Sequence, residues 1–111
     1  MKDYYDLWFI SRHFEFEGLM LAKAVRATFE CRRTVIPERP PIALTVEYSA
    51  DHNHVRQWAA FTQSLATEAT PGLGFVIDEI SEFVLPPALA AATGKRFNQY
   101  WSSQSRWQPV K

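Results

Sequence analysis

Residues 75–85 read FVIDEISEFVL, and the pattern of this stretch decides the fold class. Its apolar residues recur at the spacing of a single helix face, which predicts a buried stripe of Val76, Ile77, Ile80, Phe83 and Val84. Its acidic residues fall on the other side, so we expect water around Asp78, Glu79 and Glu82. We expect Pro86 and Pro87 to end or kink this helix. A short helix through Ala92, with Gly94 as its C-cap, would then follow.

Two helical segments are predicted near the start of the chain. The first covers about residues 2–13, with one side made of Tyr4, Leu7, Trp8 and Ser11 and widened by Phe9 and Ile10. The second covers about residues 18–32, where the i, i+4, i+7, i+8 spacing predicts a buried stripe of Leu21, Val25, Thr28 and Phe29. On its opposite side, Arg26 and Glu30 stand at the spacing of a helix ion pair.

A further helix is predicted between these segments and residues 75–85. Ser49 or Asp51 can cap its start, and the segment ATPGLG at 69–74 breaks it. Its core face is predicted to consist of Val55, Trp58, Ala59, Thr62 and Leu65, with Phe61 beside them. Because Trp58 lies in the middle of this face, we expect it to anchor the core.

The connector and the tail complete the fold prediction. Residues 34–47 read TVIPERPPIALTVE, and three prolines in five residues favour an extended path over a regular helix. Alternating Ile42, Leu44 and Val46 also allow a short strand there. The tail at 97–111, FNQYWSSQSRWQPVK, is expected to be irregular but docked through its aromatic side chains. The sequence therefore predicts one all-α domain, residues 1–111, with about four helices, a proline-rich extended connector and an irregular aromatic tail.

Composition narrows the function classes. Twelve Lys plus Arg balance twelve Asp plus Glu, so the chain lacks the overall basic charge typical of nucleic-acid-binding domains. The lone Cys31 excludes an internal disulfide and fits a reducing cytoplasm. No apolar run approaches the ~20 residues of a membrane span. Aromatic residues make up 14% of the chain, an amount of apolar area that can require a partner surface.

Several residues carry two interpretations each. Asp3 and Asp6 lie three residues apart on a helix, where two carboxylates could share a metal ion or shift each other's pKa. The simpler interpretation is negative charge stabilised by the helix dipole. A cluster of four arginines could contact RNA phosphates, although zero net charge favours a solvated helix face for them: Arg26, Arg32, Arg33 and Arg39. The tail motif YWSSQSRW could stack bases, but docking of its tryptophans is favoured.

The histidines and the cysteine give weaker signals. His52 and His54 do not share a helix face, and zinc normally needs three or four ligands, so no metal site is predicted. Cys31 has no base at a recognisable catalytic spacing, so we interpret it as a packing or exposed residue at a helix end.

The order of several motifs resembles one protein family. These motifs are KDYYDLWFISRHFEFEG at 2–18, ATFECRRTVIP at 27–37, PPIALTVEYSAD at 40–51, QWAAF at 57–61, EISEFVLP at 79–86 and the late tryptophans. Together they resemble the C-terminal region of the AbiEii/AbiGii-type toxin nucleotidyltransferases, the toxin halves of abortive-infection toxin–antitoxin pairs. The opening KDxxDL pattern is the most diagnostic of them.

The resemblance implies a chemistry for the first helix. Lys2, Asp3 and Asp6 match positions of the family's active-site helix, with Asp3 catalytic, Asp6 orienting its neighbours and Lys2 contacting a phosphate. A complete enzyme of this kind would use Mg²⁺ and a nucleoside triphosphate and would modify an RNA acceptor. The Gly-Ser stretch and the aspartate pair that hold them in the family are not found in this sequence. We therefore expect no cofactor in this chain and interpret it as a C-terminal fragment that is inactive alone.

A second hypothesis is a stand-alone interaction module that binds an antitoxin or a second copy of itself. Its motive is the aromatic face of the first helix, which includes Tyr4, Tyr5, Trp8 and Phe9. Since closed pairs are the commonest homo-oligomers, the expected assembly is a homodimer with the first helix at its interface.

Overall fold

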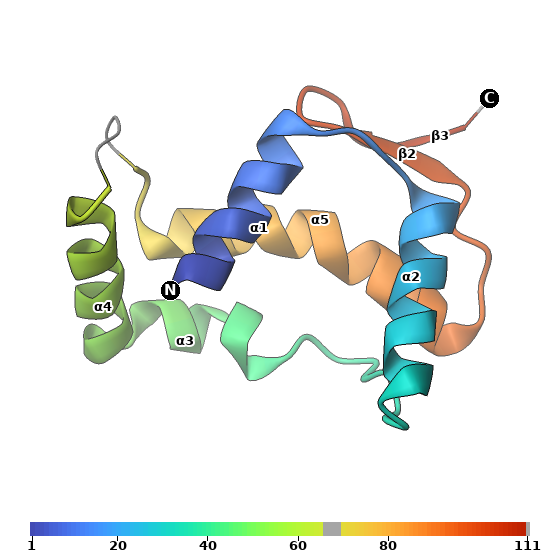
Figure 1. Cartoon of the computed structure of the whole chain (residues 1–111), viewed down its shortest axis with the longest axis horizontal. Helices are drawn as coiled ribbons and strands as arrows, with labels where there is room; N and C mark the ends of the chain where they lie inside the picture. The colour runs from blue at the N-terminus through green and yellow to red at the C-terminus, as the bar shows by residue number, and fades with distance from the viewer. Residues whose placement is uncertain (66–69, 111) are drawn as a thin grey trace.

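The longest helix, α5 (Leu73–Thr93), runs through the centre of the computed structural model, which describes residues 1–65 and 70–110. Two helices pack against it, α1 (Lys2–His13) near its start and α2 (Gly18–Cys31) near its end (Figure 1). The connector passes through a short 3₁₀ turn, η1 (Ile42–Leu44), into α3 (Val46–Ala50) and α4 (His52–Gln63). The bounds of α1 and α2 confirm the sequence prediction.

The helix α5 corrects one of the two alternatives for Pro86 and Pro87, namely that they end it and that a separate short helix follows. Both prolines lie inside the helix, which continues to Thr93. Pro87 has no N–H to donate to the carbonyl of Phe83. That carbonyl instead accepts a hydrogen bond from the indole Nε1 of Trp107, at 3.0 Å. The tail thus satisfies the backbone group that the proline leaves unpaired. Gly94 caps the helix in the left-handed conformation, as predicted, with φ at 72°.

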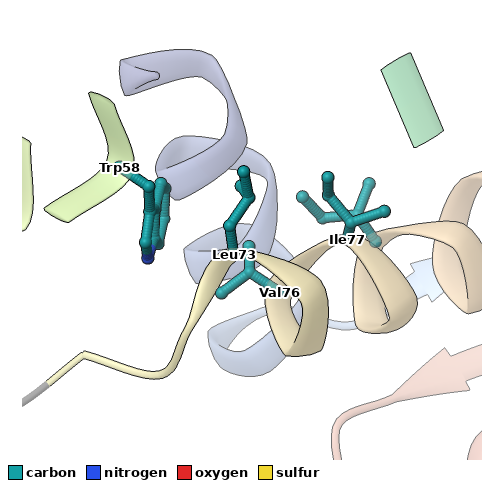
Figure 2. Packing of buried hydrophobic residues seen from close by; sticks show 5 residues of the cluster. Trp58, Leu73, Val76 and Ile77 are labelled. Carbon is teal, nitrogen blue, oxygen red and sulfur yellow. The ribbon is translucent and has the colours of Figure 1, made fainter. Parts of the chain in front are cut away.

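The core lies where α4, α1 and the first half of α5 meet. Its buried cluster consists of Trp58, Leu73, Val76, Ile77 and Ile80. Figure 2 shows Trp58, from α4, beside the first turns of α5, which carry Leu73, Val76 and Ile77. Trp58 Nε1 also donates to the carbonyl of Pro71 at 2.9 Å. The prediction that Trp58 anchors the core is confirmed.

The helix faces were predicted less well than the helix bounds. Val55 and Ala59 are exposed on α4, because this helix sits at one end of the molecule and contacts the core through a narrow stripe (Figure 1). Leu7 is 37% exposed on α1, whereas Ser11 is buried as expected. On α2, Thr28 is exposed and only Gly18 and Ala22 are buried.

Gly18 explains why α2 packs through small residues. A Cβ atom at this position would lie 2.7 Å from the carbonyl oxygen of Phe97 and 2.8 Å from that of Gln99. Such distances are too short for any side chain, so only glycine lets the start of α2 approach the chain after α5 this closely. The longer residues of the predicted stripe, Leu21, Val25 and Phe29, are consequently only half-buried.

The connector contains no strand among its described residues. The alternating Ile42, Leu44 and Val46 belong to η1 and α3, and Ile42 and Val46 are largely exposed. The side chain of Thr45 caps α3 by accepting a hydrogen bond from the N–H of Tyr48. Asp51, rather than Ser49, caps α4 and accepts from the N–H groups of Asn53 and His54.

A small antiparallel sheet corrects the all-α prediction. Its strands are β1 (Phe16–Glu17), β2 (Gln99–Ser102) and β3 (Arg106–Pro109), in the order β1-β2-β3. Trp101 pairs with Phe16 on one side and with Trp107 on the other. The tail is therefore a hairpin rather than an irregular segment.

The docking of the tail is confirmed. Trp101 is fully buried and donates from Nε1 to the carbonyl of Ser11 at 2.8 Å. Phe83 contacts both Trp101 and Trp107, at centroid distances of 4.9 and 6.2 Å. Two parts of the sequence predictions, Ala69 of the break and Lys111 of the tail, lie outside the described residues.

Candidate functional site at the start of α1

The three predicted site residues lie on the first two turns of α1. Lys2 Nζ is 3.5 Å from Asp6 Oδ2, and the Lys2 side chain is largely in solvent whereas that of Asp6 is about half exposed. Asp3 is exposed, and its carboxylate makes no hydrogen bond or ion pair with any described residue. The structure therefore brings Lys2 and Asp6 together and leaves the Asp3 carboxylate available to a ligand or a partner.

The other side of these two turns packs against the core, which fixes the position of Lys2, Asp3 and Asp6. Met1, Tyr4, Tyr5 and Trp8 pack against the core cluster. The hydroxyl of Tyr4 donates to the carbonyl of Ala43 at 2.8 Å, which ties α1 to the connector. Burial, together with the hydrogen bond of Tyr48, raises the pKa of Tyr4, so this phenol stays protonated. The orientation of the first turn is fixed by these contacts.

The three residues do not form a magnesium site by themselves. They supply two carboxylates, and that of Asp6 already faces the Lys2 ammonium. Within residues 1–65 and 70–110, no group of three or more His, Cys, Asp or Glu side chains could hold a metal ion. Because Mg²⁺ prefers an octahedral set of oxygen ligands, further ligands would have to come from outside this surface.

A buried carboxylate, which the sequence analysis missed, lies at the other end of α1. Glu79 was expected in water, but its side chain is only 7% exposed. Arg12 Nη1 donates to both of its carboxylate oxygens, at 3.0 and 3.1 Å, and Arg106 Nη2 lies 3.8 Å away. The guanidinium of Arg12 also stands 5.3 Å from the ring centre of Trp8. These contacts join α1, α5 and β3, and they explain why a charge is tolerated there.

This buried pair is not part of the Asp3 surface. Arg12 follows Asp3 by nine residues, which is about 13 Å along an α-helix. No pattern near Glu79 indicated its burial, because its partner is 67 residues away in the sequence. We therefore interpret Glu79, Arg12 and Arg106 as a structural ion-pair cluster that ties α1 and β3 to α5, and we call it the Glu79 joint.

The remaining candidates behave as packing or surface residues. The ring of His54 stacks on Tyr48, with centroids 3.6 Å apart, and its Nδ1 lies 2.9 Å from the Tyr48 carbonyl. Cys31 is exposed at the end of α2, as one interpretation expected. Arg26 and Glu30 form no ion pair, contrary to the prediction, among the contacts of the described residues.

One further basic group was missed by the sequence analysis. Lys95 and Arg96 follow the end of α5 and share a hollow with Lys23 and Arg26 of α2. The two pairs are about 70 residues apart in the sequence, so no local pattern could have joined them.

Comparison with known proteins identifies the family to which this chain belongs. Residues 1–101 match the model of a family described as nucleotidyl transferase AbiEii toxin of a type IV toxin–antitoxin system. The chain belongs to this family, and the resemblance expected from its motifs is confirmed. The match includes Lys2, Asp3 and Asp6 at the start of α1 and ends at Trp101, inside β2. No curated protein and no solved structure matches the chain.

The described helices were also compared with the requirements of a membrane span. Not one of them, in residues 1–65 and 70–110, combines the length and the apolar character that crossing a bilayer requires.

Proposed function

We propose that this chain is the helical part of a nucleotidyl-transferring toxin, that it completes the cleft for the nucleotide or the RNA acceptor, and that it is inactive alone. The observation that carries this proposal is the exposed carboxylate of Asp3, which makes no hydrogen bond or ion pair with the described residues, on a helix turn that packs against the core, in a chain that belongs to the toxin family.

The proposed roles are those that membership of the toxin family implies, and the exposed positions of the three side chains are compatible with them. Asp3 would accept the proton of the attacking hydroxyl group of the acceptor, since it is a solvent-accessible carboxylate without a competing cation. Lys2 would contact a phosphate, and Asp6, 3.5 Å from its ammonium, would orient it. The Glu79 joint would hold α1 against α5 while these residues act.

Other parts of the reaction require groups that this surface does not supply. The sequence holds neither the Gly-Ser stretch nor the aspartate pair that would bind Mg²⁺ and the triphosphate. We assign the ion and the nucleotide to a polypeptide segment with that pattern. The exposed Cys31 fits a reducing cytoplasm, where an RNA acceptor would be found.

The proposal can be tested by reconstitution. The chain is incubated with labelled nucleoside triphosphates, Mg²⁺ and total RNA, alone and after fusion to a nucleotide-binding domain with the Gly-Ser and paired-aspartate pattern. We expect label in RNA only from the fusion, and its loss in Asp3→Asn. Asp78→Asn is the matched control, because Asp78 is an exposed carboxylate on α5. Label transfer by the chain alone, abolished by Asp3→Asn, would contradict the fragment interpretation.

A second candidate function, an interaction module, is favoured by apolar surface that the fold leaves uncovered. A groove of about 600 Å³ lies between the connector and α5 and is lined by apolar side chains that include Ile36, Leu44, Val84, Leu85 and Leu89. On α1, Leu7 and Phe9 remain more than one-third exposed, whereas Tyr4, Tyr5 and Trp8 are turned toward the core.

We keep the homodimer as the assembly proposed for this second function, with Leu7 and Phe9 at its interface. An antitoxin protein is the alternative partner. Sedimentation equilibrium at micromolar concentration is expected to show a dimer that Phe9→Ser converts to a monomer. A monomeric wild-type chain would contradict self-association and leave only the antitoxin.

A further inference from the structure

A basic hollow lies between the middle of α2 and the turn that follows α5. It has a volume of about 390 Å³, and its lining includes four cationic side chains: Lys23, Arg26, Lys95 and Arg96. No Asp or Glu belongs to this lining. Lys23 and Arg26 are three residues apart and so project from one side of α2. Two separate segments therefore direct four positive charges into one place.

These charges are not neutralised by neighbouring acids. The ion pairs among the described residues use Lys2, Arg12, His54 and Arg106 as their basic partners. None of the four cations of the hollow takes part in them, and the expected partner of Arg26, Glu30, does not reach it. Although the whole chain has no net charge, a local positive field remains at this surface.

The backbone around the hollow is held in a fixed position. Gly18 places the start of α2 directly against Phe97 and Gln99. Gly94 turns the chain out of α5, and the N–H of Lys95 donates back to the Ala90 carbonyl at 3.0 Å. The ring of Phe97 packs edge-on to Trp107, 4.8 Å between centroids. The cations thus project from a preformed concave surface.

The dipole of α5 accounts for only part of this arrangement. The carboxyl end of a helix attracts cations, which explains Lys95 and Arg96. It does not explain Lys23 and Arg26, which lie in the middle of α2. Four like charges around one hollow repel each other, and a bound anion with several negative oxygens would offset this repulsion.

We propose that this hollow binds the phosphate groups of a single-stranded polynucleotide. The same chemistry would suit the phosphates of a free nucleotide. A strand is favoured because the exposed Arg32 and Arg33, at the end of α2, follow Arg26 of the hollow by six and seven residues, which is about 10 Å along an α-helix, and could contact further phosphates of the same strand. Under the proposed function the strand would be the RNA acceptor, but phosphate binding itself does not rest on transfer activity.

The test is binding of a fluorescently labelled 20-nucleotide single-stranded RNA to the whole chain, followed by anisotropy between 50 and 200 mM salt. Four neutralised phosphates predict a slope of log affinity against log salt of about −2.8. Lys23→Gln combined with Lys95→Gln should halve this slope and weaken binding about tenfold or more at 50 mM salt. Arg96→Gln alone should act in the same direction with a smaller effect.

Two controls make the outcome decisive. Arg56→Gln removes a cation from the exposed surface of α4 and should leave both affinity and slope unchanged. Thermal melting should be unchanged in all the variants, because Lys23, Lys95 and Arg96 are exposed. Absence of RNA binding, or an affinity and slope that the double variant does not alter, would overturn the proposal. Displacement of the RNA by an equal concentration of free ATP would overturn the assignment to a strand.

The same experiment separates this inference from the proposed function. Binding by a chain whose fusion fails to transfer label would contradict only the proposed function. Transfer by the fusion, together with RNA binding that the Lys23 and Lys95 substitutions do not alter, would contradict only the basic hollow.

Discussion

The two helices that pack on α5 do so with opposite kinds of side chain. The α1 end of the molecule buries large residues, with Trp58, Ile77 and Ile80 surrounded by Tyr4, Tyr5 and Trp8. At the other end, the buried residues are small: Gly18 and Ala22 on α2, and Pro87, Ala90 and Ala91 in the second half of α5. One end is stabilised by apolar area, the other by close approach of the backbone.

The two ends of the molecule also differ in how their cationic side chains are paired. At the α1 end, the long cationic side chains fold back onto carboxylates, as Arg12 and Arg106 do on Glu79. At the α2 end, Lys23 and Arg26 extend into the basic hollow instead. We infer that α1 and α2 have distinct tasks, since α1 presents acidic groups on a packed support and α2 presents unpaired cations.

The comparison predicts opposite sensitivities to changes in side-chain size, and the largest effect is expected at the α1 end. Trp58→Ala should lower the free energy of unfolding by about 3–5 kcal/mol, since it empties the centre of the core and removes the hydrogen bond to Pro71. Urea denaturation followed by circular dichroism measures this loss. An unchanged midpoint would show that the large residues do not carry the stability of this end.

At the α2 end, enlarging a residue should be the damaging change. Gly18→Ala should lower the free energy of unfolding by about 2–3 kcal/mol, because the new Cβ meets the backbone carbonyls of Phe97 and Gln99. Gly74→Ala is the matched control in the first turn of α5, where a Cβ finds no atom closer than 3.8 Å. The control should be neutral or stabilising by up to about 1 kcal/mol. Equal effects of the two substitutions would remove close approach as the explanation.

How far the sequence predicted this architecture depends on the separation of the interacting residues. The bounds of α1 and α2, the caps Asp51 and Gly94, and the anchor Trp58 follow from patterns within a few residues. Features that depend on distant residues were missed or misassigned.

Three such features show the same physical cause. Pro87 is tolerated inside α5 because Trp107 donates to the Phe83 carbonyl that the proline leaves unpaired. Glu79 is buried because Arg12 pairs with it across 67 residues. The two-residue strand β1 exists only because Trp101 and Tyr100 pair with it. In each case a tertiary partner overrides the local preference.

The two candidate sites also differ in whether their residues are close in the sequence. Lys2, Asp3 and Asp6 lie on the first two turns of one helix, as their spacing predicted, whereas their proposed chemistry rests on the family and stays a prediction. The basic hollow joins Lys23 and Arg26 to Lys95 and Arg96, from segments that only the fold brings together. Local spacing could not have predicted that juxtaposition.

A smaller effect on stability should distinguish two tryptophans, Trp8 and Trp101, that differ in their hydrogen bonds. Trp101 Nε1 donates to the Ser11 carbonyl, whereas Trp8 Nε1 is buried without a hydrogen-bond partner among the described residues. Trp101→Phe should therefore lower the free energy of unfolding by at least about 1 kcal/mol more than Trp8→Phe. Thermal melts of the two variants, each compared with wild type, measure the difference. A larger loss for Trp8→Phe would mean that its N–H has a partner in solution.

The smallest effect is expected where α2 ends. Arg33 adopts a left-handed conformation, with φ at 53°, and the N–H of the following Thr34 donates to the Phe29 carbonyl at 2.9 Å. This is the position after a helix where glycine is normally found, because a Cβ is strained there. Arg33→Gly should raise the free energy of unfolding by about 1 kcal/mol, whereas Arg32→Gly, at a helical φ of −87°, should lower it by a similar amount. Urea midpoints of the two variants decide the matter, and a loss at both positions would contradict strain at Arg33. If the same Arg33→Gly variant also weakens RNA binding, the strained arginine is retained at the α2 end for its charge, which would extend the basic surface beyond the hollow.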